Sequence, residues 1–229
     1  MTLQQYRDSH DPCFHRINAD YPGLQVVHAE PWVFLVHDLF TDAECEDLIL
    51  GVSSRLVPTR TSGGLRPDRR RSRSARCWSA ALQQKIATLV NLPTRHLEGL
   101  KVTNYQQGEY FKPHHDAFRG AHDETTGQSL WPCVPGDYPN RVVSLIGYLN
   151  DVPQGGSTYF PRLGLDVRPK KGMGLLFAPA YTATSPAHPG KQDTRLIHEG
   201  RAAVSEKWIC TQWGWSCEYI PDLDPVSGF

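Results

Sequence analysis

Two histidines and an aspartate stand side by side in the stretch YFKPHHDAF, residues 110–118. Imidazole and carboxylate groups are common metal ligands, so His114, His115 and Asp116 are candidates for a metal site. In a β-strand, alternate residues point to the same face and the residue between them points to the other. On that geometry His114 and Asp116 can share a metal, whereas His115 faces away. The spacing therefore predicts a His-x-Asp pair of ligands.

A third ligand must come from a distant segment, because two side chains do not complete a metal site. The candidate is His198, in the stretch LIHEG near the end of a predicted strand. Two histidines and one carboxylate leave three adjacent coordination positions open, as in the non-haem Fe(II) oxygenases. Zinc-dependent hydrolysis is a weaker interpretation, because the chain has neither HExxH nor a cysteine-rich ligand set. Taken alone, His-x-Asp is also compatible with ordinary polar residues of a strand.

The composition is that of a globular chain without a dominant charge. The 229 residues include 39% hydrophobic residues, 19 glycines and 18 prolines, and the formal charges sum to zero. Zero net charge gives no general signal for nucleic-acid or membrane binding, and no apolar run reaches the ~18 residues of a transmembrane helix. The first 15 residues lack the apolar segment of a secretory signal, and the six cysteines form no CxxC pair. We therefore expect a cytoplasmic protein with reduced thiols.

The elements that must position the ligands change in type along the chain. Thr41 and Glu44 form a capping box at the start of one predicted helix, and residues 79–93 carry the apolar stripe of a second. After Leu97 the hydrophobic period changes from helical toward two. Strands are predicted within residues 25–40, 100–118, 141–152, 172–179, 194–200 and 206–215.

Two helices followed by many short strands predict a mostly β fold, a barrel or sandwich with helices that support one face. The length suits one domain with extensions. We predict a loosely attached N-terminal arm at residues 1–24 and a single domain at 25–229. Within this domain we expect helical support at 41–93 and the β core at about 97–215.

One segment departs from the neutral charge balance. The stretch RPDRRRSRSAR, residues 66–76, carries six arginines and one aspartate. We interpret it as a solvated, mobile loop, with a patch for an acidic or polyanionic partner as the alternative. A rival class of function, a non-catalytic module that binds RNA, depends on the same arginines. Residues 119–140 form a segment longer than a minimal connection between two strands, and we predict that this segment is a lid over the site.

The chain resembles the prolyl 4-hydroxylase branch of the Fe(II)/2-oxoglutarate-dependent dioxygenases. The resemblance runs from about Phe34 to Trp213. It rests on five blocks in the family's order, namely NYQQGEYFKPHHDAF, RVVSLIGYLNDVPQGGSTYFP, VRPKKGMGLLFAP, IHEG and EKWICTQW. It implies a double-stranded β-helix, or jelly-roll, core. It also implies an enzyme that uses Fe(II), 2-oxoglutarate and O2, with ascorbate as a reductant.

The resemblance also implies roles for individual residues. It places the metal ligands at His114, Asp116 and His198. It places the partner of the 2-oxoglutarate C5 carboxylate at Lys207, and a buried carboxylate does need a cation. The other predicted pocket residues are Tyr105, Tyr148, Trp213 and Ser144 near the co-substrate, and Arg141 at the mouth, where it would contact substrate. The aromatic residues could instead be core residues, and Arg141 could be an ion-pair partner.

One spacing departs from the family pattern. Nine steps separate His198 from Lys207, one fewer than is common, so we expect a tighter turn between them. The substrate that the resemblance implies is a prolyl residue in a peptide or protein. The alternative is hydroxylation of a free amino acid or a small natural product by the same machinery.

Overall fold

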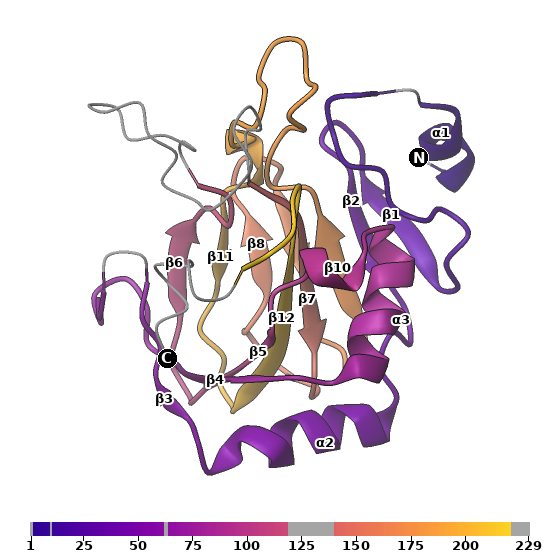
Figure 1. Cartoon of the computed structure of the whole chain (residues 1–229). Coiled ribbons are helices and arrows are strands. Elements are labelled where there is room, and N and C mark those ends of the chain that lie inside the picture. The colour runs from indigo at the N-terminus through magenta and orange to yellow at the C-terminus, as the bar shows by residue number, and fades with distance from the viewer. Residues whose placement is uncertain (1, 10, 62–63, 119–139, 221–229) are drawn as a thin grey trace.

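Two antiparallel sheets face each other in the computed structural model, which describes residues 2–9, 11–61, 64–118 and 140–220 (Figure 1). The large sheet has the order β1-β2-β10-β7-β12-β5-β4-β3 and the small sheet the order β6-β11-β8-β9. The large sheet comprises β1 (Leu24–His28), β2 (Val33–Val36), β10 (Gly174–Phe177), β7 (Arg141–Tyr148), β12 (Lys207–Trp215), β5 (Leu100–Tyr105), β4 (Arg73–Cys77) and β3 (Val57–Pro58). The small sheet comprises β6 (Phe111–His114), β11 (His198–Gly200), β8 (Thr158–Phe160) and β9 (Leu165–Val167). The mostly β jelly-roll with supporting helices is confirmed.

Three α-helices accompany the sheets in the described residues, with two short 3-10 turns. They are α1 (Leu3–Asp8), α2 (Asp42–Ser53) and α3 (Ala80–Val90), and the turns are η1 (Thr94–His96) and η2 (Thr194–Leu196). The predicted capping box is present at α2, where the Thr41 side chain accepts from the Glu44 N–H and the Glu44 side chain accepts from the Thr41 N–H. In Figure 1, α2 runs along the bottom of the molecule and α3 lies at the right, whereas β6 and β11 lie to the left of the centre. No helix of the described residues is long and apolar enough to cross a membrane.

The apolar side chains form two cores on opposite faces of the large sheet. One core joins the helices to the sheet's outer face and includes Leu48 of α2, Ile86 of α3 and Val102 of β5. The other lies between the sheets and includes Tyr148 of β7 and Phe160 of β8. The inner core packs beside the residues that are candidates for the site, so the space between the sheets is where the site is built.

The N-terminal segment is packed against the domain and is not loosely attached as expected. Tyr6 of α1 is 4% exposed and packs edge-on against the rings of Trp32 and Phe34. Its hydroxyl accepts a hydrogen bond from the Ile17 N–H at 2.9 Å. The polar composition of the segment concealed these few anchoring side chains. The division into an arm at 1–24 and one domain at 25–229 stays a prediction.

Several strand assignments differ from the expectation. The arginine-rich segment is not all loop, because Arg73–Cys77 is strand β4 and pairs with β5 along its length. The predicted strand at 194–200 begins instead with η2, whose N-cap Asp193 side chain accepts from the Arg195 N–H. Strands β8 and β9 lie between the predicted strands at 141–152 and 172–179, where no strand was predicted.

The predicted lid at 119–140 lies outside the described residues except for Asn140. The Asn140 side chain bridges to Phe118, accepting from the Phe118 N–H at 2.9 Å and donating to the Phe118 carbonyl at 3.0 Å. It also donates to the Gly190 carbonyl at 2.9 Å. The two described residues that flank 119–139 are therefore hydrogen-bonded to each other.

The cysteines do not all match the expectation of reduced thiols. Cys13, Cys45, Cys77 and Cys210 are free. Cys217 is disulfide-bonded, so the expectation was wrong for this residue. The absence of a CxxC pair gave no signal for it, because a disulfide can join residues at any separation in the chain.

Candidate active site

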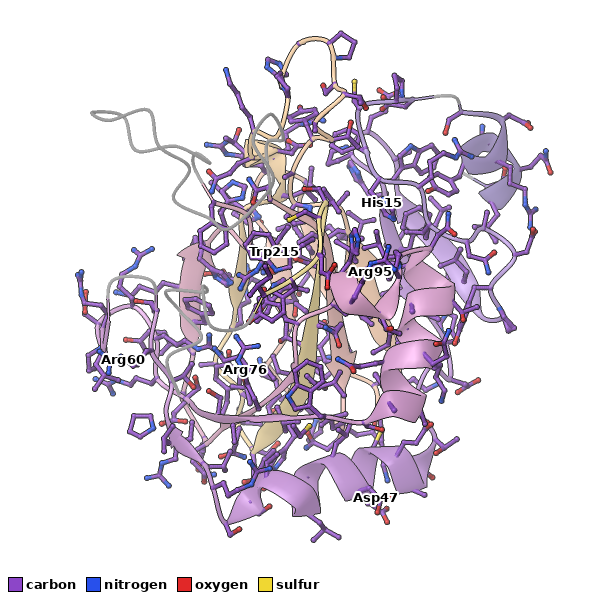
Figure 2. The ribbon with its side chains drawn as sticks, in the orientation of Figure 1. His15, Asp47, Arg60, Arg76, Arg95 and Trp215 are labelled. Carbon is purple, nitrogen blue, oxygen red and sulfur yellow. The ribbon has the colours of Figure 1, made fainter. Side chains whose placement is uncertain are left out.

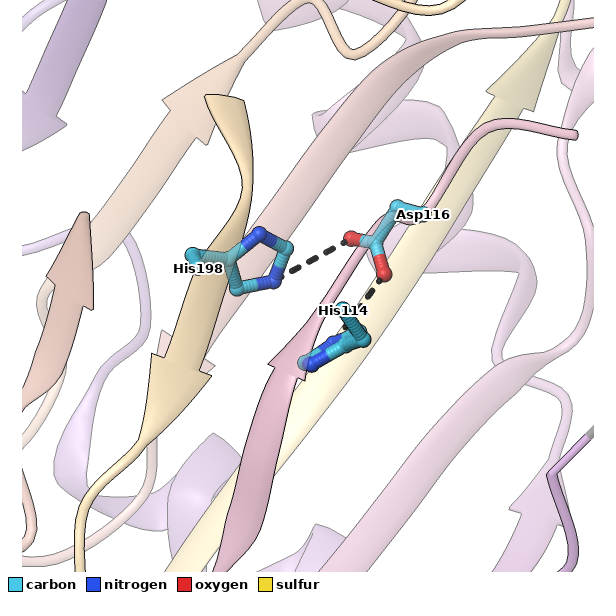
Figure 3. A group of neighbouring side chains, drawn as sticks. All are labelled: His114, Asp116 and His198. Carbon is cyan, nitrogen blue, oxygen red and sulfur yellow. Dashed lines mark ion pairs between the residues drawn. The ribbon is translucent and has the colours of Figure 1, made fainter. Parts of the chain in front are cut away.

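His114, Asp116 and His198 converge between the two sheets (Figure 3). Each offers one ligand atom, and these atoms all lie within 4.8 Å of one another. Nε2 of His114 lies 3.6 Å from Asp116 Oδ1, and Nε2 of His198 lies 3.7 Å from Asp116 Oδ2. Two metal–ligand bonds of about 2.0–2.2 Å each can span such distances. The three side chains therefore fit a single shared ion.

The ligands come from neighbouring strands of the small sheet. His114 and His198 are directly opposite in the antiparallel pairing of β6 with β11. However, β6 ends at His114, so strand alternation alone does not position Asp116. The Asp116 carbonyl accepts a hydrogen bond from Arg141 Nη1 at 3.2 Å, which ties the turn after β6 to β7. The predicted His-x-Asp pair converges, although for a partly different reason.

Both imidazole rings are oriented by backbone carbonyls two residues earlier. His114 Nδ1 donates to the Lys112 carbonyl at 3.0 Å, and His198 Nδ1 donates to the Leu196 carbonyl at 3.1 Å. These bonds hold the proton on Nδ1 and leave the Nε2 lone pair of each ring directed toward Asp116. Such outer hydrogen bonds fix the tautomer and orientation of metal-ligating histidines.

The charges of the group suit a cation. Burial by itself raises the pKa of Asp116, but His198, His114 and Arg141 lower it well below its ordinary value, so the carboxylate is ionised. Burial, together with His114, lowers the pKa of His198 to about 4. Near neutral pH the His198 ring is therefore uncharged and its Nε2 can act as a ligand.

His115 points away from this group. It does not belong to the set of convergent ligand atoms, and both of its ring nitrogens are buried without a hydrogen-bond partner among the described residues. Burial lowers the pKa of His115 to about 4, and Asp193 and Arg162 are among the charged groups that act on it. The half-buried residue also borders a wider space beside the site, and its ring faces away from the ion position as predicted.

Lys207 faces the same cavity as His198. It is 2% exposed, and its Nζ donates to the Gly156 carbonyl at 2.9 Å and lies 4.6 Å from the centre of the Tyr105 ring. No carboxylate of the described residues pairs with it. Burial and the nearby Arg70 lower its pKa to about 7. The shorter spacing from His198 has not taken Lys207 out of the cavity, because both residues line it.

Of the two tyrosines predicted beside the co-substrate, only Tyr105 lines the cavity directly. Its hydroxyl accepts from Arg70 Nη2 at 3.2 Å. Tyr148 is fully buried behind the wall and donates to Thr158 Oγ1 at 2.8 Å. Burial raises the pKa of Tyr148, so its hydroxyl stays protonated. Tyr148 therefore reaches the cavity through Thr158, which lines it.

Trp213 and Ser144 are opposite each other in the pairing of β12 with β7. Trp213 lines both the cavity at Lys207 and the wider space outside it. Ser144 is fully buried and is not among the lining residues. Trp213 Nε1 and Ser144 Oγ have no hydrogen-bond partner among the described residues.

Arg141 is committed to a buried ion pair. Its Nε donates to Glu98 Oε1 at 2.6 Å, and its guanidinium carbon lies 4.0 Å from the centre of the Trp213 ring. Glu98 is 0% exposed and also accepts from Arg76 Nη2 at 3.1 Å and from Trp215 Nε1 at 2.9 Å. The predicted residue at the mouth is thus an ion-pair partner that supports Asp116, although it also borders the wider space.

Among the further lining residues that the sequence analysis did not single out, three carry polar or aromatic groups next to the ligands or Lys207. Arg70, Phe111 and Thr158 line the cavity. The Phe111 ring stacks on His114 with ring centres 3.5 Å apart, and the Arg70 guanidinium lies 4.3 Å from the Phe111 ring centre. Phe111 belonged to the quoted ligand stretch and could have been found. Arg70 was interpreted as part of a loop, and nothing in the sequence separates it from its neighbouring arginines.

A wide open cavity of ≈ 820 Å³ leads to the metal ligands. His114 and Asp116 line it, together with Phe118, Arg141 and Trp213. Residues of the arginine-rich segment line it as well. The ion position therefore borders both the polar cavity at Lys207 and this wider space, the open groove.

The sequence profile of the 2OG-Fe(II) oxygenase superfamily matches residues 100–215, just over half of the chain. The chain therefore belongs to this superfamily. It is an oxidoreductase that uses Fe(II), 2-oxoglutarate and O2, and the three convergent ligands fit the metal. Membership of an enzyme family leaves the non-catalytic RNA-binding module without support.

Several similar proteins are named prolyl hydroxylases. Prolyl 4-hydroxylase 1 of Arabidopsis thaliana is 29% identical over 82% of this chain and 70% of its own length. The human prolyl 4-hydroxylase subunit alpha-3 is 28% identical over 82% of this chain but 34% of its own length. The structure of a viral collagen prolyl hydroxylase from Paramecium Bursaria Chlorella virus-1, a 2-oxoglutarate complex, matches with a TM-score of 0.61 and 23% identity. It covers 83% of this chain and 99% of the viral protein. The chain is thus a prolyl 4-hydroxylase-like member of the superfamily.

Proposed function

We propose that this enzyme hydroxylates a prolyl residue within a peptide or protein. The observation that carries the proposal is the open cavity of ≈ 820 Å³ that His114 and Asp116 line, because such a groove admits an extended chain. The likeness to prolyl 4-hydroxylases over most of the chain supports it. A prolyl hydroxylase from Trichoplax adhaerens, in complex with a peptide fragment, has a TM-score of 0.55 and shares the fold at 15% identity.

Different residues of the site would bind the metal and the co-substrate. His114, Asp116 and His198 would hold Fe(II), and Lys207 would pair with the far carboxylate of 2-oxoglutarate, which gives its buried charge the anion it lacks. Together, bound Fe(II), 2-oxoglutarate and O2 supply the oxidising chemistry that replaces a C–H bond with C–OH.

The surrounding side chains position these groups and exclude water. Arg141 holds the Asp116 carbonyl, and the Phe111 ring covers one face of His114. Trp213 stands between the cavity at Lys207 and the groove, where it would border both co-substrate and substrate. In this arrangement Arg141 acts through Asp116 as a positioning residue.

The test compares substrates under one assay. The enzyme is incubated with Fe(II), 2-oxoglutarate and proline peptides blocked at both ends, beside free proline and other free amino acids. We expect succinate formation that depends on the peptide, and a product heavier by one oxygen atom. Turnover of free amino acids without turnover of peptides would contradict the proposal and would favour hydroxylation of a small-molecule substrate.

Two further expectations stay proposals. Ascorbate is proposed as a reductant that maintains Fe(II), and its omission should reduce the number of turnovers before activity is lost. A cytoplasmic location is also proposed, although the disulfide at Cys217 is more typical of an oxidising compartment. Cell fractionation, together with the redox state of Cys217 in each fraction, tests the location.

A further inference from the structure

The open groove has a strongly basic wall. Seven cationic side chains line it, and Asp116 is the one carboxylate among the described lining residues. The seven are Arg60, Arg66, Arg69, Arg70, Arg76, Lys101 and Arg141. Figure 2 shows Arg76 and Trp215 in front of the large sheet, with Arg60 in the connection beyond β3. Because Asp116 already faces the metal position, it does not balance this wall.

Among the described residues, two carboxylates pair with arginines of this wall. Arg66 pairs with Asp68 at 3.1 Å. Glu98 is shared by Arg141 at 2.6 Å and Arg76 at 3.1 Å. Since Glu98 also accepts from the indole of Trp215, it has little capacity left for another cation.

Lys101 is a member of the wall for which no described carboxylate is an ion-pair partner. It is partly buried, its Nζ lies 5.8 Å from the centre of the Trp213 ring, and no described residue accepts a hydrogen bond from it. Burial lowers the pKa of Lys101 well below its ordinary value, and Arg70, Arg76 and Arg141 lower it further. Glu98 raises it, but less than these groups lower it. A bound anion beside the ammonium would reverse this imbalance.

Lys101 is too far from the co-substrate cavity to share its carboxylate. On β5, Lys101 lies four residues before Tyr105 and on the same face, which is about 13 Å at ~3.3 Å per residue. Lys101 pairs with Thr211, whereas Tyr105 pairs with Lys207 at the other end of the ladder. Lys101 and Lys207 therefore serve two separate positions, one in the groove and one in the cavity.

We propose that Lys101 and the arginines around it form an anion subsite that binds a carboxylate of the substrate. This inference rests on the proposed peptide substrate and deepens it, because it specifies a proline peptide with an acidic residue near the target proline. Trp213 borders both the subsite and the metal cavity, so the acidic side chain would lie within a few residues of the oxidised carbon.

The test uses blocked heptapeptides with proline at the centre and one glutamate, which is moved from three positions before the proline to three after it. Each peptide is paired with its glutamine counterpart. Binding is measured by calorimetry without O2, with Fe(II) and 2-oxoglutarate present, and turnover is measured separately by product mass. The proteins are wild type, Lys101→Gln, Lys101→Met and, as a control remote from the groove, the exposed Lys170→Gln.

In wild type we expect about tenfold tighter binding of the glutamate peptide at one position, as for a charge-assisted hydrogen bond. Both Lys101 variants should bind the two peptides of that pair equally, whereas Lys170→Gln should keep the preference. A peptide with a free C-terminal carboxylate but no glutamate shows whether a chain end can supply the anion instead.

The result that overturns the inference is an absence of glutamate preference in wild type, or its survival in both Lys101 variants. An absence of binding by every glutamate peptide overturns it as well. Binding with the expected preference but without hydroxylation would contradict the proposed function while supporting the subsite. Melting temperatures of the variants, compared with wild type, show that a lost preference is not caused by unfolding.

Discussion

His114 and His198 face each other directly across β6 and β11, although they are far apart in the chain. Their ring centres are 4.3 Å apart, and each ring is held by the carbonyl two residues before it. Two rings from paired strands thus present their Nε2 atoms to the same carboxylate. The small sheet therefore acts as the support that brings distant segments to one ion.

The three histidines His114, His115 and His198 should differ in their effect on metal binding. His114→Ala and His198→Ala should each lower Fe(II) affinity and succinate formation at least 100-fold, because each removes one convergent ligand atom. His115→Ala should change both by less than about threefold. Metal titration of the three variants is the measurement, and full turnover in His198→Ala would reject the ligand set.

The affinity for 2-oxoglutarate should depend on pH through Lys207. Burial lowers its pKa to about 7, so above this pH the cavity loses its ammonium unless the co-substrate binds. Because the carboxylate favours the charged form, the dissociation constant should rise with pH from about 7 to 9, by at most about tenfold per unit. Lys207→Arg should flatten this dependence, because arginine stays charged. A flat profile for wild type would show that Lys207 does not pair with the co-substrate.

The Gly156 backbone should matter for co-substrate binding. Gly156 has φ +67°, and its carbonyl accepts from Lys207. An added Cβ would lie 3.0 Å from both the Ala203 Cβ and the Val152 Cγ1. Gly164→Ala is the matched control, because Gly164 has φ +64° but nothing within 4 Å of an added Cβ.

Both alanine variants should lose about 1 kcal/mol of stability from the backbone conformation. Only Gly156→Ala should also raise the KM for 2-oxoglutarate, which assays at varied co-substrate would reveal. Equal KM values for the two variants would remove Gly156 from the co-substrate cavity.

Glu98 should contribute strongly to stability. Glu98→Gln leaves two guanidinium groups with a neutral partner in a buried place, which should cost about 3 kcal/mol in urea unfolding. Glu46→Gln is the control, since the exposed pair of Glu46 with Lys171 should contribute less than about 1 kcal/mol. A similar small loss in both variants would contradict the structural role of Glu98.

The same carboxylate should make stability depend on pH. Burial by itself raises the pKa of Glu98, but Arg141 and Arg76 outweigh it and the folded-state pKa lies below the ordinary 4.5. The stabilisation is therefore fully present above about pH 4.5 and is lost as the pH falls through the folded-state pKa. The loss of stability in acid should be smaller in Glu98→Gln than in wild type.

Site residues could be predicted from the sequence where a short motif contains them, but not where only the folded sheet brings their partners together. The alternation of residues in YFKPHHDAF and the order of the family blocks led to His114, Asp116, His198 and Lys207, which the structure brings to one region. Glu98 gave no signal, because its three partners lie in β4, β7 and β12 and are defined only by the folded sheet. Strand β4 was missed for a related reason, since its arginines conceal the backbone pairing with β5.

Asn140 suggests where this protein can be altered with little disturbance. Its side chain joins Phe118 to the start of β7, so the ends of residues 119–139 are held together by the folded part itself. Each doubling of the number of residues between two such fixed ends costs only about 0.6 kcal/mol of closure entropy. A change in the number of residues between Phe118 and Asn140 should therefore cost little closure entropy, while the strands that carry His114 and His198 stay as they are.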